Sequence, residues 1–370
     1  MENNSYVVNT SKINRVSFTV TSLCNGRCTF CFNRMRSIQE ALLHDDESIS
    51  LGEYESIIIQ ALLLGLEQIE LSGGEVLLNV KKTLSMIKFA KENGVRIGIF
   101  TNGTLLSTET IKKLKNSKID FVRIGICGDE KTHAIERKTT PKEFKAIYDG
   151  IKKCIEEGLT TRLFVTVTKN TAPYINKTLD FLAENFAGAE HCMVDFYIQS
   201  GIKAKDEQFL MAPEQYIKTI DTLCKKIREH KNKLKIIPFY GTFPFLSKEY
   251  QGEEIAHSEC GKTRVAVLPK GRVFPCLCTQ DLIGDLNKEK LEDIAKKLPC
   301  PEYDYSKYAP CCKCMHYKIC HDSACPSLTF NQRHNYLGPP TNCPIVIKYE
   351  ELTQQGNPEK EALTKAWELN

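Results

Sequence analysis

Three cysteines near the start of the chain are the residues whose types and spacing most clearly predict chemistry. Cys24, Cys28 and Cys31 lie in the run Cys-Asn-Gly-Arg-Cys-Thr-Phe-Cys, directly after an apolar, strand-like segment. Soft thiolates are the ligands that iron–sulfur clusters prefer. Three of them on one loop can hold three irons of a [4Fe–4S] cube and leave the fourth iron open to another ligand. The alternatives are a zinc loop and three cysteines that bind no metal.

Further segments with glycine or polar residues follow at the ends of the next expected strands. Gly73, Gly74 and Glu75 end the second strand, Asn102 lies in a Thr-Asn-Gly turn after the third, and Arg137 follows the fourth. Glycine lets a backbone approach a ligand closely, and an Arg guanidinium pairs with a carboxylate in bidentate geometry. Taken alone, Gly-Gly-Glu is more often a plain turn. Its position at a strand end, after the cysteine loop, strengthens the signal.

Together with the cysteine loop, these segments resemble the radical S-adenosylmethionine (SAM) enzymes. In that family the open iron binds the amino and carboxylate groups of SAM, and one electron from the cluster cleaves SAM to a 5′-deoxyadenosyl radical. The resemblance implies that Gly73, Gly74 and Glu75 hold the SAM amino group. It also implies that Arg137 pairs with the SAM carboxylate. Asn102 is expected to be structural first, with contact to SAM or substrate as its alternative role.

Two positions after the fourth strand depart from the family's usual Ser-x-Asp-Gly pattern. Gly125 stands where many relatives have a serine that helps to bind SAM, and Cys127 stands where they have an aspartate. Cys127 has two interpretations. One is a small buried apolar residue. The other is a thiol that faces the radical and donates a hydrogen atom to a substrate radical.

A second set of cysteines occupies the C-terminal third of the chain, where ten of the 17 cysteines lie between Cys260 and Cys343. Their order resembles the SPASM domain of some radical SAM enzymes, which carries two auxiliary [4Fe–4S] clusters. By that resemblance, the first auxiliary cluster takes Cys260, Cys276 and Cys325, and the second takes Cys311, Cys314, Cys320 and Cys343. The first cluster is then left with an open iron or takes Cys278. A pair of zinc sites is the alternative to both clusters.

The elements that must position these residues are parallel strands whose carboxyl ends meet at one edge. Between about residues 12 and 200, strand-like segments alternate with segments of helical periodicity, which predicts a parallel sheet with right-handed crossovers. The expected strands are Arg15–Thr21, Gln68–Ser72, Arg96–Thr101, Phe121–Ile126, Thr161–Val167 and Met193–Ile198. The expected helices are Leu51–Leu64, Val80–Asn93, Thr108–Asn116, Lys142–Glu157 and Tyr174–Phe186. This α/β order resembles the partial (β/α)6 barrel of the radical SAM family, in which catalytic groups lie at the carboxyl ends of the strands.

We expect three units along the chain. These are a radical SAM barrel over 12–235, a SPASM auxiliary-cluster domain over 255–346, and a C-terminal helical segment over 347–370. The run from Val265 to Cys276 is expected to form a β-hairpin that turns at Pro269-Lys270-Gly271.

Composition limits where the protein works and what it binds. A net charge of +4 is too small to predict nucleic-acid binding. No apolar run approaches the ~20 residues of a membrane span, and the polar N-terminus lacks a signal-peptide pattern. We therefore expect a cytoplasmic protein with no nucleic-acid and no membrane partner, in which the clustered cysteines bind metal rather than form disulfides.

The resemblance implies an oxidoreductase that uses SAM, three [4Fe–4S] clusters and a reductant such as flavodoxin or ferredoxin. SPASM enzymes mostly act on peptides, so we expect a precursor peptide or protein as substrate and an oxidative cross-link, thioether or carbon–carbon, as product. The enzyme alternatives are peptide epimerisation, formylglycine-type sulfatase maturation and a small-molecule SPASM reaction. Sulfatase maturases have an aspartate, thought to act as base, where this chain has Leu277. The non-enzyme alternative is an iron–sulfur electron carrier.

Overall fold

The computed structural model describes residues 12–31, 48–200, 207–238, 261–279, 281–298, 308–312 and 343–368, together with Cys314, Tyr317, Phe330 and Pro339. The predicted cluster ligands Cys260, Cys320 and Cys325 lie outside the described residues.

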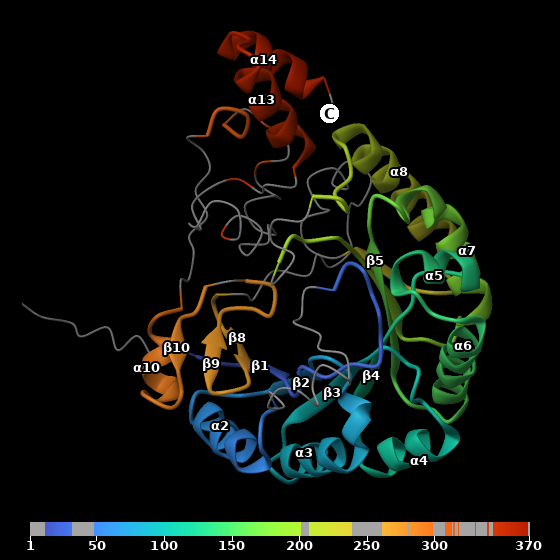
Figure 1. Ribbon diagram of the computed structural model, residues 1–370, viewed down its shortest axis with the longest axis vertical. Helices are drawn as coiled ribbons and strands as arrows, with labels where there is room; N and C mark the ends of the chain where they lie inside the picture. Colours follow the sequence, from blue (N-terminus) through green and yellow to red (C-terminus); the bar gives the residue numbers. More distant parts are fainter. Residues whose placement is uncertain are drawn as a thin grey trace, which may run out of the picture.

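One curved, mostly parallel sheet organises the described residues (Figure 1). Its strands follow the order β10-β9-β8-β1-β2-β3-β4-β5-β6-β7. The bounds are β1 Arg15–Thr19, β2 Gln68–Ser72, β3 Arg96–Thr101, β4 Phe121–Gly125, β5 Thr161–Val167, β6 His191–Phe196, β7 Ile236–Pro238, β8 Arg264–Leu268, β9 Arg272–Phe274 and β10 Gly284–Asp285. Neighbours from β8 through β1 to β7 are parallel, whereas β9 and β10 continue the β8 edge as antiparallel strands.

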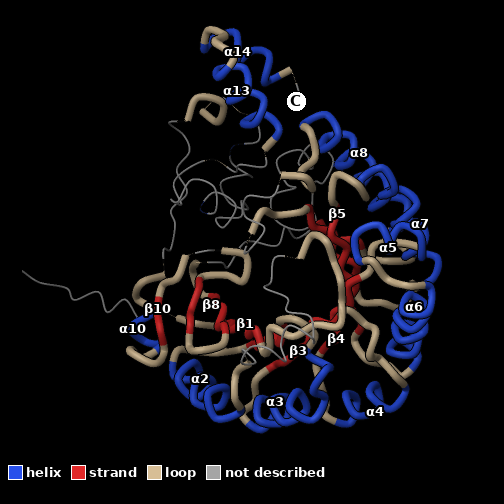
Figure 2. Tube along the Cα trace, viewed as in Figure 1, coloured by secondary structure: helices blue, strands red, loops and turns tan. Residues whose placement is uncertain are grey.

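Helices cover the outer, convex face of the curved sheet, so the strands lie inside the layer of helices (Figure 2). The helices along the barrel are α2 Leu51–Leu63, α3 Val80–Glu92, α4 Thr108–Asn116, α5 Glu130–Arg137, α6 Pro141–Glu156, α7 Ile175–Asn185 and α8 Pro213–His230. Short 3-10 turns, η1 Val76–Asn79 and η2 Ala172–Tyr174, lead into α3 and α7. The later helices are α10 Leu291–Ala295, α13 Pro344–Gln354 and α14 Glu359–Trp367.

Local sequence explains where the helices begin. Helix α6 starts at a capping box in which Thr140 caps the Glu143 amide and Glu143 caps the Thr140 amide, with Pro141 at the first helical position. Its buried residues Phe144, Ile147 and Ile151 recur at helical spacing and face the sheet. The N-terminus of α2 carries the same kind of box.

Alternation along the strands separates the apolar core from the site. In β1, Val16 and Phe18 belong to the buried core between sheet and helices, where the Phe18 ring lies 4.9 Å from that of Tyr54 in α2. The side chains between them point to the other face of the sheet, because successive residues of a strand alternate. Polar residues such as Glu70 of β2 and Arg123 of β4 occupy that inner face. The inner face of the sheet therefore carries polar and charged side chains, and the outer face packs against the helices to form the apolar core.

The predicted alternation of parallel strands and helices is confirmed, with most bounds within one or two residues. Strands β2, β3 and β5 begin and end where the sequence predicts, and β6 begins two residues earlier, at His191. Helix α5 was not predicted because its eight residues are too few and too polar to show an apolar stripe. None of the described helices has the length and apolar character needed to cross a membrane.

The β8–β9 hairpin forms as predicted, with Lys270 and Gly271 at positive φ in the turn. It is joined to the barrel, because β8 pairs in parallel with β1. At the C-terminus, α13 and α14 pack on each other, and the Trp367 indole N–H donates to the Pro310 carbonyl at 3.1 Å.

Candidate functional site

The three cysteines of the N-terminal loop open into one cavity of about 260 Å³ on the inner face of the sheet. It is also lined by Phe30, Ser72, Gly73, Gly74, Phe100, Thr101, Asn102, Arg123, Gly125, Arg137, Phe164, Thr166, Met193, Asp195, Ile198, Arg264, Cys276, Leu277 and Cys278. Cys24, Cys28 and Cys31 are free thiols. Burial raises the pKa of Cys24 to about 11, so its thiolate needs a cation to form at neutral pH.

The Gly73-Gly74-Glu75 segment after β2 holds the cysteine loop in place through backbone contacts. The Gly74 amide donates to the Thr21 carbonyl at 2.8 Å, and the Glu75 amide donates to the Leu23 carbonyl at 2.7 Å. A Cβ at Gly74 would lie only 1.8 Å from the Leu23 carbonyl oxygen. Gly73 adopts a φ of 136°, and a Cβ there would lie 2.5 Å from the Thr21 oxygen. Residues without side chains are therefore required at both positions by the backbone of the cysteine loop, whereas the sequence suggested close approach to a ligand.

The Glu75 side chain is fully buried and is not among the residues that line the cavity. Its carboxylate accepts hydrogen bonds from the Leu77 amide at 3.0 Å, the Thr101 hydroxyl at 2.7 Å and the Asn102 amide at 2.7 Å. Burial raises its pKa, and these hydrogen bonds oppose that rise. Glu75 thus connects the ends of β2 and β3 behind the cavity, a positioning role that differs from the expected side-chain contact to SAM.

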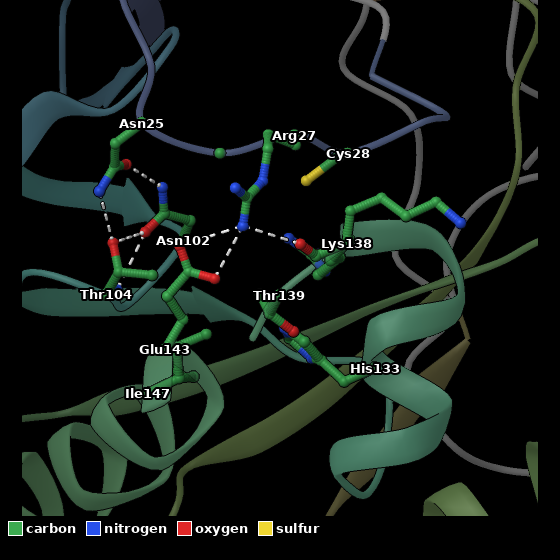
Figure 3. A pocket seen from close by; sticks show the side chains of 12 residues that line it. Asn25, Arg27, Cys28, Asn102, Thr104, His133, Lys138, Thr139, Glu143 and Ile147 are labelled. Carbon is green, nitrogen blue, oxygen red and sulfur yellow. Dashed lines mark hydrogen bonds and ion pairs between the residues drawn. The ribbon is translucent and has the colours of Figure 1, made fainter. Parts of the chain in front are cut away.

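Asn102 connects the turn after β3 to the cysteine loop (Figure 3). Its amide nitrogen lies 2.8 Å from the Asn25 oxygen and 3.8 Å from the Cys24 sulfur. Its amide oxygen accepts from the Thr104 amide and hydroxyl, and Asn25 donates to the same hydroxyl at 2.9 Å. This network connects the loop between Cys24 and Cys28 to the turn after β3, and a contact of Asn102 with SAM or substrate stays a prediction.

Arg137, in the last turn of α5, reaches the cavity beside the cysteine loop. Its Nε donates to the Cys127 sulfur at 3.2 Å, and its guanidinium lies 5.4 Å from the centre of the Phe30 ring. Burial acts to lower the pKa of Arg137, but the neighbouring Cys127, Cys28 and Cys31 sulfurs raise it, so the side chain stays charged. A Cβ at Gly125 would lie 2.6 Å from Arg137 Nη2. The glycine that replaces the family's serine therefore makes room for this guanidinium.

Cys127 lies behind Arg137 rather than on the cavity wall. The residue is 1% exposed and is not among those that line the cavity. Its amide donates to His133 Nδ1 at 3.1 Å, and burial lowers the pKa of His133 to about 2, so that ring is neutral. These contacts favour the buried interpretation of Cys127. In addition, its sulfur accepts a hydrogen bond from Arg137.

Helix α5 is tied to the site by Glu136, a residue that the sequence analysis missed. The Glu136 carboxylate accepts hydrogen bonds from Thr29 of the cysteine loop, from Thr168 at 2.9 Å and from Asn170 at 2.8 Å. The Glu136 carbonyl also accepts from the Thr29 amide at 2.8 Å. Glu136 therefore fixes α5, and with it Arg137, against the cysteine loop and the end of β5.

Asp195 is a second residue that the sequence analysis missed. It lies near the end of β6, lines the cavity and is 9% exposed. Within the described part of the chain, its Oδ1 has no hydrogen-bond partner. Burial raises its pKa well above the usual value, and the nearby Cys276 adds to that rise. The only sequence signal was an aspartate among apolar residues near the end of an expected strand.

Two cavity-lining arginines share one buried carboxylate. Glu70 of β2 lies 2.6 Å from Arg264 of β8 and 3.7 Å from Arg123 of β4. The Ser17 hydroxyl of β1 also donates to Glu70, at 3.3 Å. Burial acts to raise the pKa of Glu70, but the arginines lower it to about 2. The network links four strands across the inner face of the sheet.

Of the cysteines expected to bind auxiliary clusters, Cys276 lines the same cavity as the N-terminal loop. Leu277 and Cys278 line it as well, and the Cys278 amide lies 3.4 Å from the Cys276 sulfur. Cys311, Cys314 and Cys343 are free thiols in the C-terminal region. Burial raises the pKa of Cys343 to about 11, and the nearby Cys314 contributes to that rise. Cys314 and Cys343 thus interact electrostatically, and their binding of a second auxiliary cluster stays a prediction.

The donor groups of the cavity fit an iron–sulfur cluster with SAM. The loop offers three free thiols and, between Cys24 and Cys31, no carboxylate or imidazole that would favour a harder metal. A buried guanidinium and closely approachable backbone at Gly73 and Gly74 lie beside those thiols. These are groups that can bind a carboxylate and an ammonium.

Comparison with known proteins agrees with this geometry. Residues 18–182 match the family model described as the Radical SAM superfamily. The chain contains a radical SAM domain. The matched span includes the cysteine loop, the Gly-Gly-Glu segment, Asn102 and Arg137.

Proteins similar to this radical SAM chain act on different kinds of molecule. An AdoMet-dependent heme synthase of Methanosarcina barkeri is 24% identical over 341 residues, covering 87% of this chain and 93% of that protein. A probable GTP 3′,8-cyclase of Methanococcus aeolicus is 24% identical over 283 residues, covering 74% of this chain and 89% of that protein. AdoMet is another abbreviation of SAM.

Solved structures with the same fold include two that hold peptides. Streptococcus suis SuiB bound to its precursor peptide SuiA has a TM-score of 0.67 at 19% identity, covering 90% of this chain and 76% of SuiB. The structure of anSMEcpe with bound AdoMet and the Cp18Cys peptide has a TM-score of 0.67 at 17% identity, covering 97% of this chain and all of that one. At these identities the likeness shows a shared fold.

Proposed function

We propose that this radical SAM enzyme modifies a precursor peptide or protein by an oxidative reaction that yields a thioether or carbon–carbon cross-link. The observation that carries the proposal is the shared cavity. It joins the loop of Cys24, Cys28 and Cys31 to the Cys276-Leu277-Cys278 segment, which follows a different strand of the sheet. A substrate in this cavity would touch both the radical source and a first auxiliary cluster.

The chain's own residues have separate parts in this proposal. Cys24, Cys28 and Cys31 hold the SAM-binding cluster, and Arg137 pairs with the SAM carboxylate. The backbone around Gly73 and Gly74 receives the SAM ammonium, with Glu75 and Asn102 holding that backbone and the cysteine loop in position. When bound, the cluster and SAM would supply a 5′-deoxyadenosyl radical, given an electron from a partner such as flavodoxin or ferredoxin.

The C-terminal cysteines account for the oxidative outcome. Removing a hydrogen atom leaves a substrate radical, and a closed-shell cross-link requires that one further electron be taken away. A first auxiliary cluster held by Cys276, with Cys260 and Cys325 as its other predicted ligands, would accept that electron, and Cys276 lines the cavity in which the substrate would bind. Cys311, Cys314, Cys320 and Cys343 would hold a second cluster for relay, giving three [4Fe–4S] clusters in all.

Asp195 adds a group that can handle a substrate proton or hydrogen-bond donor. It faces the cavity near Cys276 and has an oxygen without a hydrogen-bond partner among the described residues. Leu277 cannot act as a base, and Asp195 is the one carboxyl group among the described residues that line the cavity.

A small-molecule reaction is the second candidate, and one observation favours it. The heme synthase relative matches 87% of this chain and 93% of its own length, so the similarity extends beyond the radical SAM domain. A tetrapyrrole would then occupy the cavity in place of a peptide side chain.

Anaerobic reaction of the reconstituted enzyme with SAM, reductant and the product of a short open reading frame beside the gene tests the proposal. Mass spectrometry should show a loss of two hydrogens from the peptide. Uptake of one solvent deuterium with stereochemical inversion would instead indicate epimerisation, and turnover of a tetrapyrrole but of no peptide would favour the second candidate. Either result would contradict the cross-linking proposal.

Two variants separate the roles of cavity residues in that assay. Asp195→Asn should reduce peptide turnover by about tenfold or more while leaving SAM affinity unchanged, since Asp195 is proposed to touch only substrate. Cys127→Ala should keep the two-hydrogen loss, because the Cys127 thiol does not line the cavity. Loss of an inversion product in Cys127→Ala would revive its role as hydrogen donor.

A further inference from the structure

Arg123 is a buried cation that has no hydrogen-bond partner among the described residues. The residue is 8% exposed and belongs to the cavity wall. Within the described ranges, its Nε has no partner, and its contact with Glu70 is an ion pair at 3.7 Å, too long for a hydrogen bond. A buried charge without hydrogen bonds is costly, so proteins seldom keep one unless a ligand completes it.

The neighbouring Glu70 does not account for this arginine. Its carboxylate is engaged at 2.6 Å by Arg264, which also donates to Ser17 at 2.8 Å. Arg264 alone can therefore neutralise Glu70. Arg123 would be redundant if its task were only to balance that carboxylate.

Packing aims the Arg123 guanidinium at the cavity. Its central carbon lies 4.3 Å from the centre of the Phe100 ring and 5.6 Å from that of Phe121, so aromatic rings support it. Phe100, Phe164 and Met193 form apolar cavity wall on strands β3, β5 and β6. A planar guanidinium held in this way presents its N–H groups to the open space, where a carboxylate or phosphate can bind bidentately.

The SAM carboxylate is already assigned to a different arginine. Arg137 packs against Gly125, two residues beyond Arg123 on the same face of β4. A strand rises about 3.3 Å per residue, so Arg123 lies about 7 Å deeper in the barrel. An anion bound by Arg123 would therefore be a different group from the SAM carboxylate.

We propose that Arg123 binds an oxyanion of the substrate, a carboxylate or a phosphate, and so selects an acidic substrate that enters the barrel beneath SAM. This inference deepens the proposed function and rests on it in placing the substrate in this cavity. For a peptide, the anion is an acidic side chain or a C-terminal carboxylate near the residue that is modified.

Paired substitutions of the two arginines test this in the reconstituted full-length enzyme. Arg123→Met removes an unsatisfied charge and keeps the contact with Phe100, so the apparent melting temperature without added ligand should rise by about 2–4 °C. Arg264→Met leaves Glu70 without its near partner and should lower the melting temperature. A fall for Arg123→Met comparable with that for Arg264→Met would show a structural ion pair and overturn the proposal.

Small anions probe the site directly. Sodium acetate and sodium phosphate, each compared with acetamide and with sodium chloride at equal ionic strength, should raise the melting temperature of the SAM-bound enzyme. Acetate acting alone identifies a carboxylate, and phosphate acting alone identifies a phosphate. The stabilisation should persist in the control Arg228→Met, because Arg228 is exposed on α8. In Arg123→Met, the anion concentration needed for the same rise in melting temperature should be about tenfold higher.

Two results would overturn the assignment. Equal anion stabilisation in wild type and Arg123→Met would place the anions elsewhere. SAM affinity that falls in Arg123→Met as far as in Arg137→Ala would show that Arg123 binds the SAM carboxylate. Reductive cleavage of SAM without substrate should stay normal in the exposed control Arg228→Met. Failure of wild type to cleave SAM at all would count against the proposed function and not against the anion site.

Discussion

At the scale of single residues, the Gly-Gly-Glu segment acts through the missing side chain of Gly74 and the hydrogen bonds of Glu75. Gly74 permits a contact that any side chain would block, and Glu75 fixes the neighbouring strand end from behind. The segment therefore acts on the cysteine loop as well as on SAM.

Gly74→Ala tests that dependence. The new Cβ would lie 1.8 Å from the Leu23 carbonyl oxygen, so the cysteine loop must move. We expect loss of about four irons per chain and of reductive SAM cleavage, measured by iron analysis and by 5′-deoxyadenosine formation. Gly52→Ala is the matched control, because a Cβ there meets nothing within 4 Å. Full iron content in Gly74→Ala would show that the loop tolerates the shift.

Arg137→Ala tests the SAM carboxylate partner. A charge-assisted pair contributes about 1.5–3 kcal/mol, so SAM should bind about ten- to a hundredfold more weakly in anaerobic calorimetry. Arg137→Lys should recover only part of the affinity, because lysine keeps the charge and loses the bidentate geometry. The exposed Arg228→Ala serves as control. Unchanged SAM affinity in Arg137→Ala would remove this residue from the site.

At the scale of elements, buried polar side chains hold separate segments at fixed distances around the cavity. Glu136 ties α5 to the cysteine loop and to the end of β5. Glu70 connects β2 to β1, β4 and β8. These carboxylates hold in place segments from distant parts of the sequence that the curved sheet brings to the same cavity.

Glu70 should make the stability of the fold depend on pH in the acid range. Its pKa is about 2 in the folded chain against an ordinary 4.5, so its contribution is complete above pH 4.5 and is lost as the pH falls toward 2. Glu70→Gln should lower the free energy of unfolding by roughly 3 kcal/mol at pH 7 and by little near pH 2. Urea titrations at several pH values measure both, with the exposed Glu92→Gln as control. A difference independent of pH would contradict the charge-based account.

At the scale of the whole molecule, one sheet joins the radical SAM domain to the C-terminal cysteines. Strand β8 pairs with β1, and the hairpin that it begins ends beside Cys276 on the cavity wall. The first auxiliary cluster is therefore proposed at the edge of the barrel itself. The C-terminal helices α13 and α14 pack near α8, at the other end of the sheet.

Iron content tests the proposed set of three clusters. The reconstituted wild type should hold about twelve irons per chain, and the triple variant Cys24→Ala, Cys28→Ala, Cys31→Ala should hold about eight and cleave no SAM. The buried Cys154→Ala is the control, since Cys154 lies in the core on α6. About four irons in the wild type would rule out both auxiliary clusters. Zinc in place of iron in the C-terminal region would support the zinc alternative.

The sequence by itself determined the cysteine loop, the strand and helix order and the hairpin. These features depend on local spacing, on alternation of apolar residues and on turn residues, all of which are visible within a few positions. Cys24, Cys28 and Cys31 lie within eight residues of one another, so no folding information is needed to group them. The position of the Gly-Gly-Glu segment directly after β2 was predictable for the same reason.

Only the tertiary structure decided which distant side chains meet. Arg123, Asp195 and Cys276 lie on or after β4, β6 and β9, and no local pattern links them. Their meeting depends on the curvature of the sheet, which brings inward-facing side chains from separate strands to one cavity. The buried position of Glu75 was equally hidden, and the sequence left open whether Cys127 is buried or faces the radical, because a strand-end residue can face the cavity or lie behind it. Side-chain direction at such ends is set by packing across the whole sheet, which the sequence does not display.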